Sequence, residues 1–226
     1  MKKTLLLALV ALLLSAKAFA GGGNHSFTGF SLTYNYMDVK TSCKFESVSG
    51  FNDNFMLHGF SAGFIAHQQL VSFLYLTTGV HYQFAMKQEN VTGGDFGVYN
   101  HNLKVPIKLA FSMAFGKKSG FSIHAGPSLD FMVSTQADYY YDRDNYAYTD
   151  MVSGRTVTRV AGYKTTATVS KTLGWFDIPL GVGATLNFGN FGLRFDYEWG
   201  MINRSLDTNS YSWKADQLTA GLFFIF

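Results

Sequence analysis

Apolar side chains alternate with small or polar ones along several stretches of this chain, most clearly from Leu103 to Phe115. The odd positions of that stretch are Leu, Val, Ile, Leu, Phe, Met and Phe, whereas the even positions are Lys, Pro, Lys, Ala, Ser and Ala. Successive side chains of a β-strand point to opposite faces, so this period of two predicts a strand with one oily face. The stretch is also long enough for a tilted membrane-spanning strand, which needs roughly nine to eleven residues.

The same alternation recurs along the chain and predicts about eight strands, an even number as bacterial barrels require. It is clear from Phe121 to Val133 and from Phe191 to Trp199. The other segments cover residues 27–37, 55–66, 71–86, 174–188 and 215–226. Up to Asp216 the oily faces contain no Lys, Arg, Asp or Glu, while the opposite faces hold Gly, Ser, Thr and Asn. An oily exterior around a crowded polar interior is typical of a narrow transmembrane barrel.

The predicted connections alternate between short and long. Short turns are expected at 66–70, 116–120 and 189–190, and long loops at about 38–54, 87–101, 134–173 and 202–214. Outer-membrane barrels have short turns on the periplasmic side and long loops outside. The sequence therefore predicts an all-β fold, a single antiparallel up-and-down transmembrane β-barrel with long extracellular loops and short periplasmic turns.

Three prolines lie inside predicted strands, namely Pro106, Pro127 and Pro179. Proline cannot donate a ladder hydrogen bond, and a closed sheet has no edge strand to accommodate it. We therefore expect β-bulges at these positions.

The first 20 residues have the pattern of a cleavable signal peptide. Lys2 and Lys3 precede an apolar run, and Ala18-Phe19-Ala20 provides a small-x-small cleavage site. We expect residues 1–20 to be the signal peptide and residues 21–226 to form the barrel domain in the outer membrane of a Gram-negative bacterium. Expected partners are outer-membrane lipid with its lipopolysaccharide and the barrel-insertion machinery.

Four short segments form a distinctive set of motifs: Asn-Leu-Lys-Val-Pro-Ile-Lys-Leu at 102–109, His-Ala-Gly-Pro-Ser-Leu at 124–129, Phe-Asp-Ile-Pro-Leu-Gly-Val-Gly-Ala at 176–184 and the aromatic C-terminus. With these motifs the chain resembles the PorT-like outer-membrane β-barrel family of Bacteroidetes, whose barrels are similar to the eight-stranded OmpA and OmpX type. The resemblance implies fold and location, but no enzymatic activity and no functional residues. The terminal aromatic residue also resembles the signal that the insertion machinery recognises.

Seven charged side chains share the polar face of the predicted strands: Lys104, Lys108, Asp130, Asp177, Arg194, Asp196 and Glu198. His81 and Gln83 are expected on the same face. Charges of both signs in one narrow lumen should pair, because an unpaired charge away from water is costly. This pattern predicts an internal salt-bridge plug, and the alternative is a small gated pore whose selectivity these charges tune.

The longest predicted loop is rich in residues that binding surfaces favour. These are Tyr139, Tyr140, Tyr141, Tyr146, Tyr148, Arg155 and Arg159. Residues 156–169 are rich in β-prone Thr and Val, which predicts a sheet extending beyond the membrane. The loop could bind an extracellular ligand or protein partner, contact lipopolysaccharide phosphates, or be a solvated loop without a fixed partner.

The function that fits this pattern best is a non-enzymatic surface protein whose loops bind a ligand, surface or partner. A porin-like small-solute channel is the first alternative and a lipid A-modifying enzyme the second. The side chains that could form a Ser/His/acid catalytic set are poorly placed for it. His58 and Ser61 fall on opposite strand faces, and His124, Ser128 and Asp130 point inward. The six histidines lack metal-site spacing, so neither metal nor cofactor is expected. The net charge of +3, without basic runs, argues against a nucleic-acid partner.

Overall fold

The computed structural model describes nine stretches of the chain: residues 26–43, 55–91, 94–116, 119–141, 146–149, 156–159, 164–168, 173–205 and 211–226. The predicted signal peptide at 1–20 lies outside them. Every regular element in these stretches is a β-strand. The described residues include no helix that is long and apolar enough to cross a membrane.

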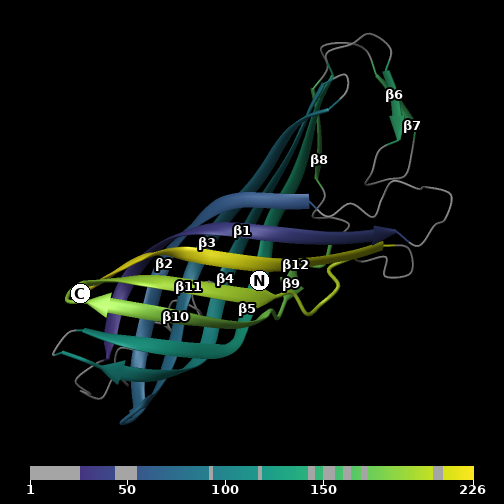
Figure 1. The fold of residues 1–226 in the computed structure, drawn as a ribbon. Helices are drawn as coiled ribbons and strands as arrows, with labels where there is room; N and C mark the ends of the chain where they lie inside the picture. The colour runs from purple at the N-terminus through teal and green to yellow at the C-terminus, as the bar shows by residue number, and fades with distance from the viewer. Residues whose placement is uncertain are drawn as a thin grey trace.

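Eight strands form a closed antiparallel barrel (Figure 1). They are β1 (Phe27–Cys43), β2 (Phe55–Val71), β3 (Leu74–Val91), β4 (Gly94–Ala114), β5 (Ser119–Tyr141), β10 (Leu180–Phe188), β11 (Phe191–Trp199) and β12 (Tyr211–Ile225). Each pairs with the next, β5 pairs with β10, and β12 returns to pair with β1. The predicted eight-stranded up-and-down barrel is confirmed.

The barrel closes along a continuous seam between β1 and β12. Their register runs from Gly29 opposite Ile225 to Cys43 opposite Tyr211. Beyond the Gly29–Ile225 pair, the N–H of Phe226 donates to the carbonyl oxygen of Thr28 at 3.1 Å. Closure leaves neither β1 nor β12 with an open edge along this seam, which is the condition for crossing lipid with strands.

Three shorter strands lie outside the ring: β6 (Tyr146–Thr149), β7 (Thr156–Arg159) and β8 (Lys164–Thr168). A fourth, β9 (Phe176–Asp177), precedes β10 and pairs with β5 in the same register as β10, so it belongs to the barrel wall. The far part of β5 pairs with β8 from Gln136 to Tyr140, and β6 pairs with β7. Figure 1 shows β6, β7 and β8 beyond the barrel end that lies away from the C-terminus. We call this the outer end and the end with the 189–190 turn the inner end. The predicted extension of the sheet is present.

The two faces of the barrel have the expected polarity. Large apolar side chains point outward, among them Leu32, Phe60 and Phe64, the last two exposed at 62% and 58%. Aromatic residues near the strand ends, such as Trp175 and Phe115, are also exposed. The buried inward positions include many polar and charged side chains, so the barrel is inverted relative to a water-soluble sheet protein.

The connections differ from the prediction in several places, because strands run further than expected. β1 continues to Cys43 and β5 to Tyr141, although loops were predicted from 38 and from 134. The loop predicted for 87–101 is mostly strand, because β3 runs to Val91 and β4 begins at Gly94. The turn predicted at 66–70 lies at 72–73, because β2 continues to Val71. Polar residues near that end of β2, including His67, face the crowded lumen and do not form a turn. The two-residue turn at Gly189-Asn190 is as predicted, and its glycine has the positive φ of 63° that such turns favour.

The expectation of bulges at the prolines is wrong. Register shifts occur at Gln69/Val71 in β2 and at His101/Asn102 in β4. At Pro106 the β3–β4 ladder passes from Thr78 opposite Ile107 to His81 opposite Lys104 in unchanged register. A proline can therefore interrupt the ladder locally without an added residue, since only its own N–H is missing.

At the outer end the polarity of β1 reverses. Met37 and Val39 point inward and are buried, whereas Lys40 is exposed. The members of the buried apolar group, which we call the outer apolar cluster, are Met37, Val39, Leu57, Ala85 and Val98, and Phe55, Trp213 and Ala215 pack against it. On β1 this end therefore has an apolar inside and a polar outside, as in a sheet surrounded by water.

Candidate functional site: the filled lumen

Aromatic rings fill the inner end of the lumen. Phe223 stacks on Phe27 at 5.4 Å between ring centroids, Phe27 on His67 at 5.1 Å, and His67 on Tyr75 at 4.5 Å. These residues come from β12, β1, β2 and β3, so the aromatic stack crosses four consecutive strands. His67 is also held through hydrogen-bond contacts of its two ring nitrogens with Thr77 and Ser112.

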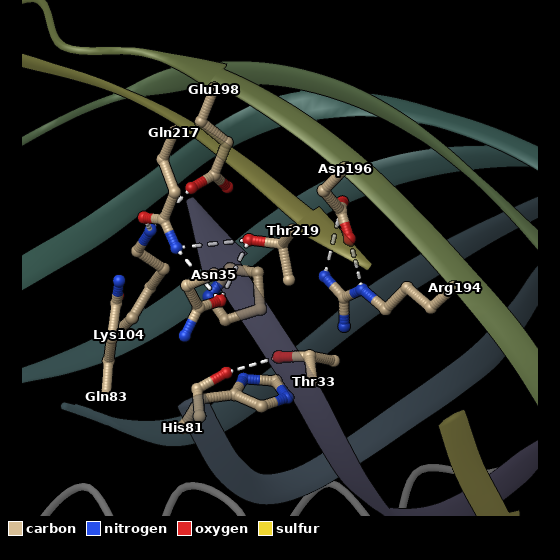
Figure 2. Close-up of a pocket in the computed structure, with 12 residues that line it drawn as sticks. Thr33, Asn35, His81, Gln83, Lys104, Arg194, Asp196, Glu198, Gln217 and Thr219 are labelled. Atoms are coloured by element: carbon tan, nitrogen blue, oxygen red, sulfur yellow. Dashed lines mark hydrogen bonds and ion pairs between the residues drawn. The ribbon is translucent and has the colours of Figure 1, made fainter. Parts of the chain in front are cut away.

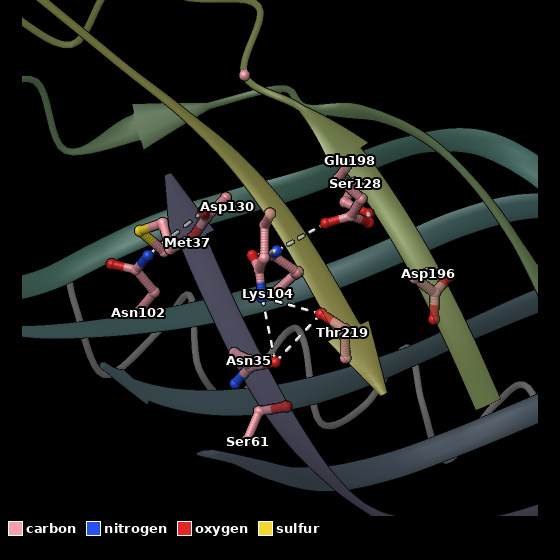
Figure 3. A network of polar contacts seen from close by, with 12 residues as sticks. Asn35, Met37, Ser61, Asn102, Lys104, Ser128, Asp130, Asp196, Glu198 and Thr219 are labelled. Carbon is pink, nitrogen blue, oxygen red and sulfur yellow. Dashed lines mark hydrogen bonds and ion pairs between the residues drawn. The ribbon is translucent and has the colours of Figure 1, made fainter. Parts of the chain in front are cut away.

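A network of buried charges occupies the middle of the lumen (Figure 3). Lys104 Nζ lies 2.7 Å from Oε2 of Glu198. Lys108 Nζ lies 2.7 Å from Oδ1 of Asp196 and 2.9 Å from Oε1 of Glu198. Ser128 donates a hydrogen bond to the same Glu198 oxygen at 2.7 Å. One ammonium thus joins two carboxylates that stand two residues apart on β11, and their charges are compensated.

Asp196 has two further partners. The Nε2 atom of His124 lies 2.7 Å from its Oδ1, and the guanidinium of Arg194 contacts its Oδ2. The contact with His124 is close because Gly183 lies beside it. A Cβ at Gly183 would stand 2.4 Å from His124 Nε2 and 2.7 Å from Asp196 Oδ1. The absence of that side chain leaves the room in which the imidazole and the carboxylate meet.

A second, smaller group forms around Arg204. Its Nη2 lies 2.7 Å from Oδ2 of Asp130, and its Nε lies 3.6 Å from Oδ2 of Asp177. The other Asp177 oxygen accepts backbone N–H groups of Ile178 at 2.7 Å and Ile202 at 3.0 Å. These contacts connect β5, β9 and the segment before β12.

All seven charged residues predicted for the lumen are buried. Five of them form one network, namely Lys104, Lys108, Arg194, Asp196 and Glu198. The other two, Asp130 and Asp177, pair with Arg204, which the sequence prediction missed. Arg204 lies beyond the alternating β11 segment, which ends at Trp199, so the alternation did not indicate the direction of its side chain. It adds the fourth positive charge and balances the four buried carboxylates.

For the residues predicted for the binding loop, the structure gives only backbone positions. Tyr139, Tyr140 and Tyr141 end β5, Tyr146 and Tyr148 lie on β6, and Arg159 ends β7. Their side chains and all of Arg155 lie outside the described residues.

The structure does not join the candidate catalytic side chains. His58 lies on the exterior with its Nδ1 atom 2.5 Å from the hydroxyl of Tyr34, whereas Ser61 is buried. His124 contacts Asp196, while Ser128 donates to Glu198. Within the described part of the chain, His, Cys, Asp and Glu form no group of three that could hold a metal ion.

The comparisons with known proteins give similar structures only. No protein-family model matches the chain, and no curated protein matches it. Ail of Yersinia pestis is 15% identical over 88% of this chain and 99% of that chain, with a TM-score of 0.37. Neisserial surface protein A is 14% identical over 87% and 97%, with a TM-score of 0.42. The barrel domain of Pseudomonas aeruginosa OprF is 13% identical over 87% and 97%, with a TM-score of 0.29.

Proposed function

We propose that this chain is a non-enzymatic outer-membrane β-barrel protein of a Gram-negative bacterium whose extracellular segments bind a ligand, a surface polysaccharide or a protein partner. In this proposal the barrel is the anchor. Residues 1–20 direct export and are removed, and the insertion machinery places the barrel in the membrane. Membership of the PorT-like family is part of the proposal and rests on the sequence motifs alone.

The observation that carries the proposal is the filled lumen. The aromatic stack, the charge network and the outer apolar cluster follow one another along the barrel axis, and apart from the partly buried Phe27 their side chains are buried. A porin-like channel needs a continuous water path, which narrow eight-stranded barrels usually lack. With the interior occupied, the remaining surfaces for function are the lipid-facing wall and the extracellular segments.

The lipid-facing wall supports the membrane location. Its exposed apolar side chains surround the barrel, and aromatic residues lie near both strand ends, as in interfacial girdles. Water-soluble proteins rarely expose an apolar surface of this extent. Lipid and lipopolysaccharide are therefore proposed as the partners of this wall.

The outer end supports a binding role. The described pairings of the main sheet end at β8, which pairs with β5 on one side. An edge strand can accept an added strand from a partner. The tyrosines of β5 and β6 and the arginines at 155 and 159 lie in the same part of the chain, and we propose that they belong to the binding surface.

The binding role is tested by deleting residues 138–168, with deletion of residues 206–210 in another extracellular segment as the matched control. Cells producing each variant are applied to immobilised glycans and extracellular-matrix proteins. Both variants should keep heat-modifiable gel mobility, which reports a folded barrel. Only the first should lose binding that the parent shows. Unchanged binding by the first variant, or no binding by the parent, would contradict the role.

Location and conductance are tested separately. Protease treatment of whole cells should release peptides only from extracellular segments such as 44–54 and 142–163, with the barrel strands protected. The purified protein should give no steady ion conductance in planar bilayers. A soluble cell fraction would overturn the location, and steady conductance would favour the channel.

A further inference from the structure

Two histidines point to the outside of the barrel, and each is bonded to a tyrosine. Nδ1 of His58 lies 2.5 Å from the hydroxyl oxygen of Tyr34, and Nδ1 of His101 lies 2.6 Å from that of Tyr82. The other described histidines are buried in the lumen, and Figure 2 shows one of them, His81, beside a small cavity there. Among the described residues, a tyrosine hydroxyl is therefore the partner of the outward histidines alone.

The two tyrosine–histidine pairs are built in the same way on adjacent hairpins. On β1, Tyr34 is displaced by two residues, toward the inner end, from the position opposite His58 on β2. On β3, Tyr82 is displaced by two residues in the same direction from the position opposite His101 on β4. Each tyrosine thus reaches diagonally across its strand pair, as long side chains can. Because β2 pairs with β3, the two pairs belong to one patch of the outer wall.

This patch lies where the outward face changes from apolar to charged. On β1 the last uncharged outward residue before the outer end is Tyr36, and Asp38 and Lys40 follow it on the same face. Asp216 and Lys214 lie opposite these two on β12, so the charges beyond the patch balance. Amphipathic aromatic side chains at such a boundary lie at the level of the lipid headgroups.

Each pair keeps a hydrogen-bond donor in every arrangement of its protons. If the tyrosine hydroxyl donates to Nδ1, the neutral imidazole carries its hydrogen on Nε2. If Nδ1 donates instead, the hydroxyl hydrogen is left over, and a charged imidazole leaves both hydrogens. In the described part of the chain, Nε2 of His58 and Nε2 of His101 have no partner. The patch therefore presents donors toward the membrane.

Lipid phosphate matches these donors in charge and position. An ionised phosphate oxygen accepts hydrogen bonds, and its charge strengthens a bond from an imidazole N–H. The rings of Phe60 and Phe84 lie opposite each other on β2 and β3, between the two pairs. Phe60 is 62% exposed and can contact the acyl chains of the lipid whose phosphate the pairs hold. The patch thus combines headgroup donors with an apolar surface.

We propose that the two outward tyrosine–histidine pairs bind the phosphate groups of lipopolysaccharide in the outer leaflet. The inference rests on the proposed membrane location. It assigns a defined headgroup site to a wall for which the proposed function gives only general contact with lipid. The site is separate from the extracellular segments, so it is independent of the ligand that those segments bind.

The proposal is tested with lipid A, the membrane part of lipopolysaccharide. The purified, folded barrel in detergent is titrated with diphosphoryl lipid A and with the same lipid after removal of its phosphates, and native mass spectrometry measures the bound lipid. The parent should bind the phosphorylated form about tenfold more tightly, the order that one hydrogen bond to a charged group contributes. Equal binding of the two forms would assign the contact to sugar or acyl chains and overturn the proposal.

Substitution locates the site. The variant that combines His58→Phe with His101→Phe should lose the preference for the phosphorylated form. Tyr197→Phe is the matched control and should keep it, because Tyr197 is an exposed outward tyrosine that contacts Trp199 and, among the described residues, no histidine. A preference that persists in the double variant, or disappears in the control, would overturn the assignment.

A spectroscopic measurement on the parent decides if the double variant does not fold. Phosphorylated lipid A should shift the imidazole ¹⁵N resonances of His58 and His101 at constant pH and leave those of the buried His67 and His124 unchanged. Unshifted resonances of the two outward rings would overturn the proposal. A negative result would not affect the membrane location, which protease treatment of whole cells tests separately.

Discussion

Lys108 on β4 and Asp196 on β11 meet inside the barrel, with Nζ 2.7 Å from Oδ1, although 88 residues separate them in the chain. The Lys108 side chain is fully buried. Since β4 and β11 are not neighbours in the sheet, this ion pair joins two parts of the wall that share no ladder hydrogen bonds. The stability of the barrel should therefore depend on it.

Lys108→Met removes the ammonium and leaves Asp196 and Glu198 without a common counter-ion. Breaking a buried pair in this way should lower the free energy of unfolding by about 3–5 kcal/mol. Urea unfolding in lipid vesicles, followed by gel mobility, measures it. The control is Lys40→Met, because Lys40 pairs with Asp216 but is half-exposed, and an exposed pair contributes about 1 kcal/mol or less. Equal losses in the two variants would contradict the assigned role.

Phe223 and Phe224 are neighbours that face opposite ways, and they separate lumen packing from lipid contact. Phe223→Ala removes a fully buried ring from the aromatic stack and should cost about 3–5 kcal/mol. Phe224→Ala changes a side chain that is half-exposed on the outer wall and should cost clearly less. The same unfolding measurement compares them. A larger loss for Phe224→Ala would mean that the stack does not stabilise the inner end.

A lysine scan along the outward face tests where the membrane lies. Leu32→Lys places a charge within the apolar wall, which costs about 2–4 kcal/mol at the bilayer midplane. Met56→Lys lies on the same outward face near the outer apolar cluster and should cost about 0–1 kcal/mol, as expected near an interface. Equilibrium unfolding from vesicles gives both values. If the two costs are reversed, the membrane boundary is misplaced.

Gly183→Ala tests the close contact beside His124. The added Cβ would stand 2.4 Å from His124 Nε2 and 2.5 Å from the carbonyl oxygen of Phe195. Overpacking of this kind should cost about 1–3 kcal/mol. Gly116→Ala is the control, because its Cβ would meet its nearest atom at 3.5 Å, an ordinary contact. Equal unfolding midpoints for the two variants would show that the wall yields at Gly183 without cost.

Strand number and face assignment could be predicted because one physical constraint repeats along the chain. Within the apolar wall every second side chain must be oily, as in the segment from Leu103 to Phe115, where Ile107, Leu109 and Phe111 are indeed exposed. The same alternation of odd and even positions placed Lys104 and Lys108 in the lumen. The alternation also places Gln217 inward, and in the structure Gln217 contacts Lys104 and Asn35.

The outer strand ends could not be predicted by that rule because the rule itself changes there. Beyond Tyr36 the inward residues of β1 are Met37 and Val39, and the outward Lys40 is polar. A search for an oily outward face therefore ended too early and assigned 38–43 to a loop. Arg204 lies in a segment without alternation, so it left no local signal.

The seam between β1 and β12 has a consequence for folding kinetics. The barrel cannot close until its last strand is available, because the partner of the first strand lies near the other end of the chain. Contacts so distant in sequence form slowly, since a long loop must be ordered before they contribute. Until then β1 has an unpaired edge that could pair with other chains. A chain of this topology therefore needs protection from aggregation for as long as the ring is open.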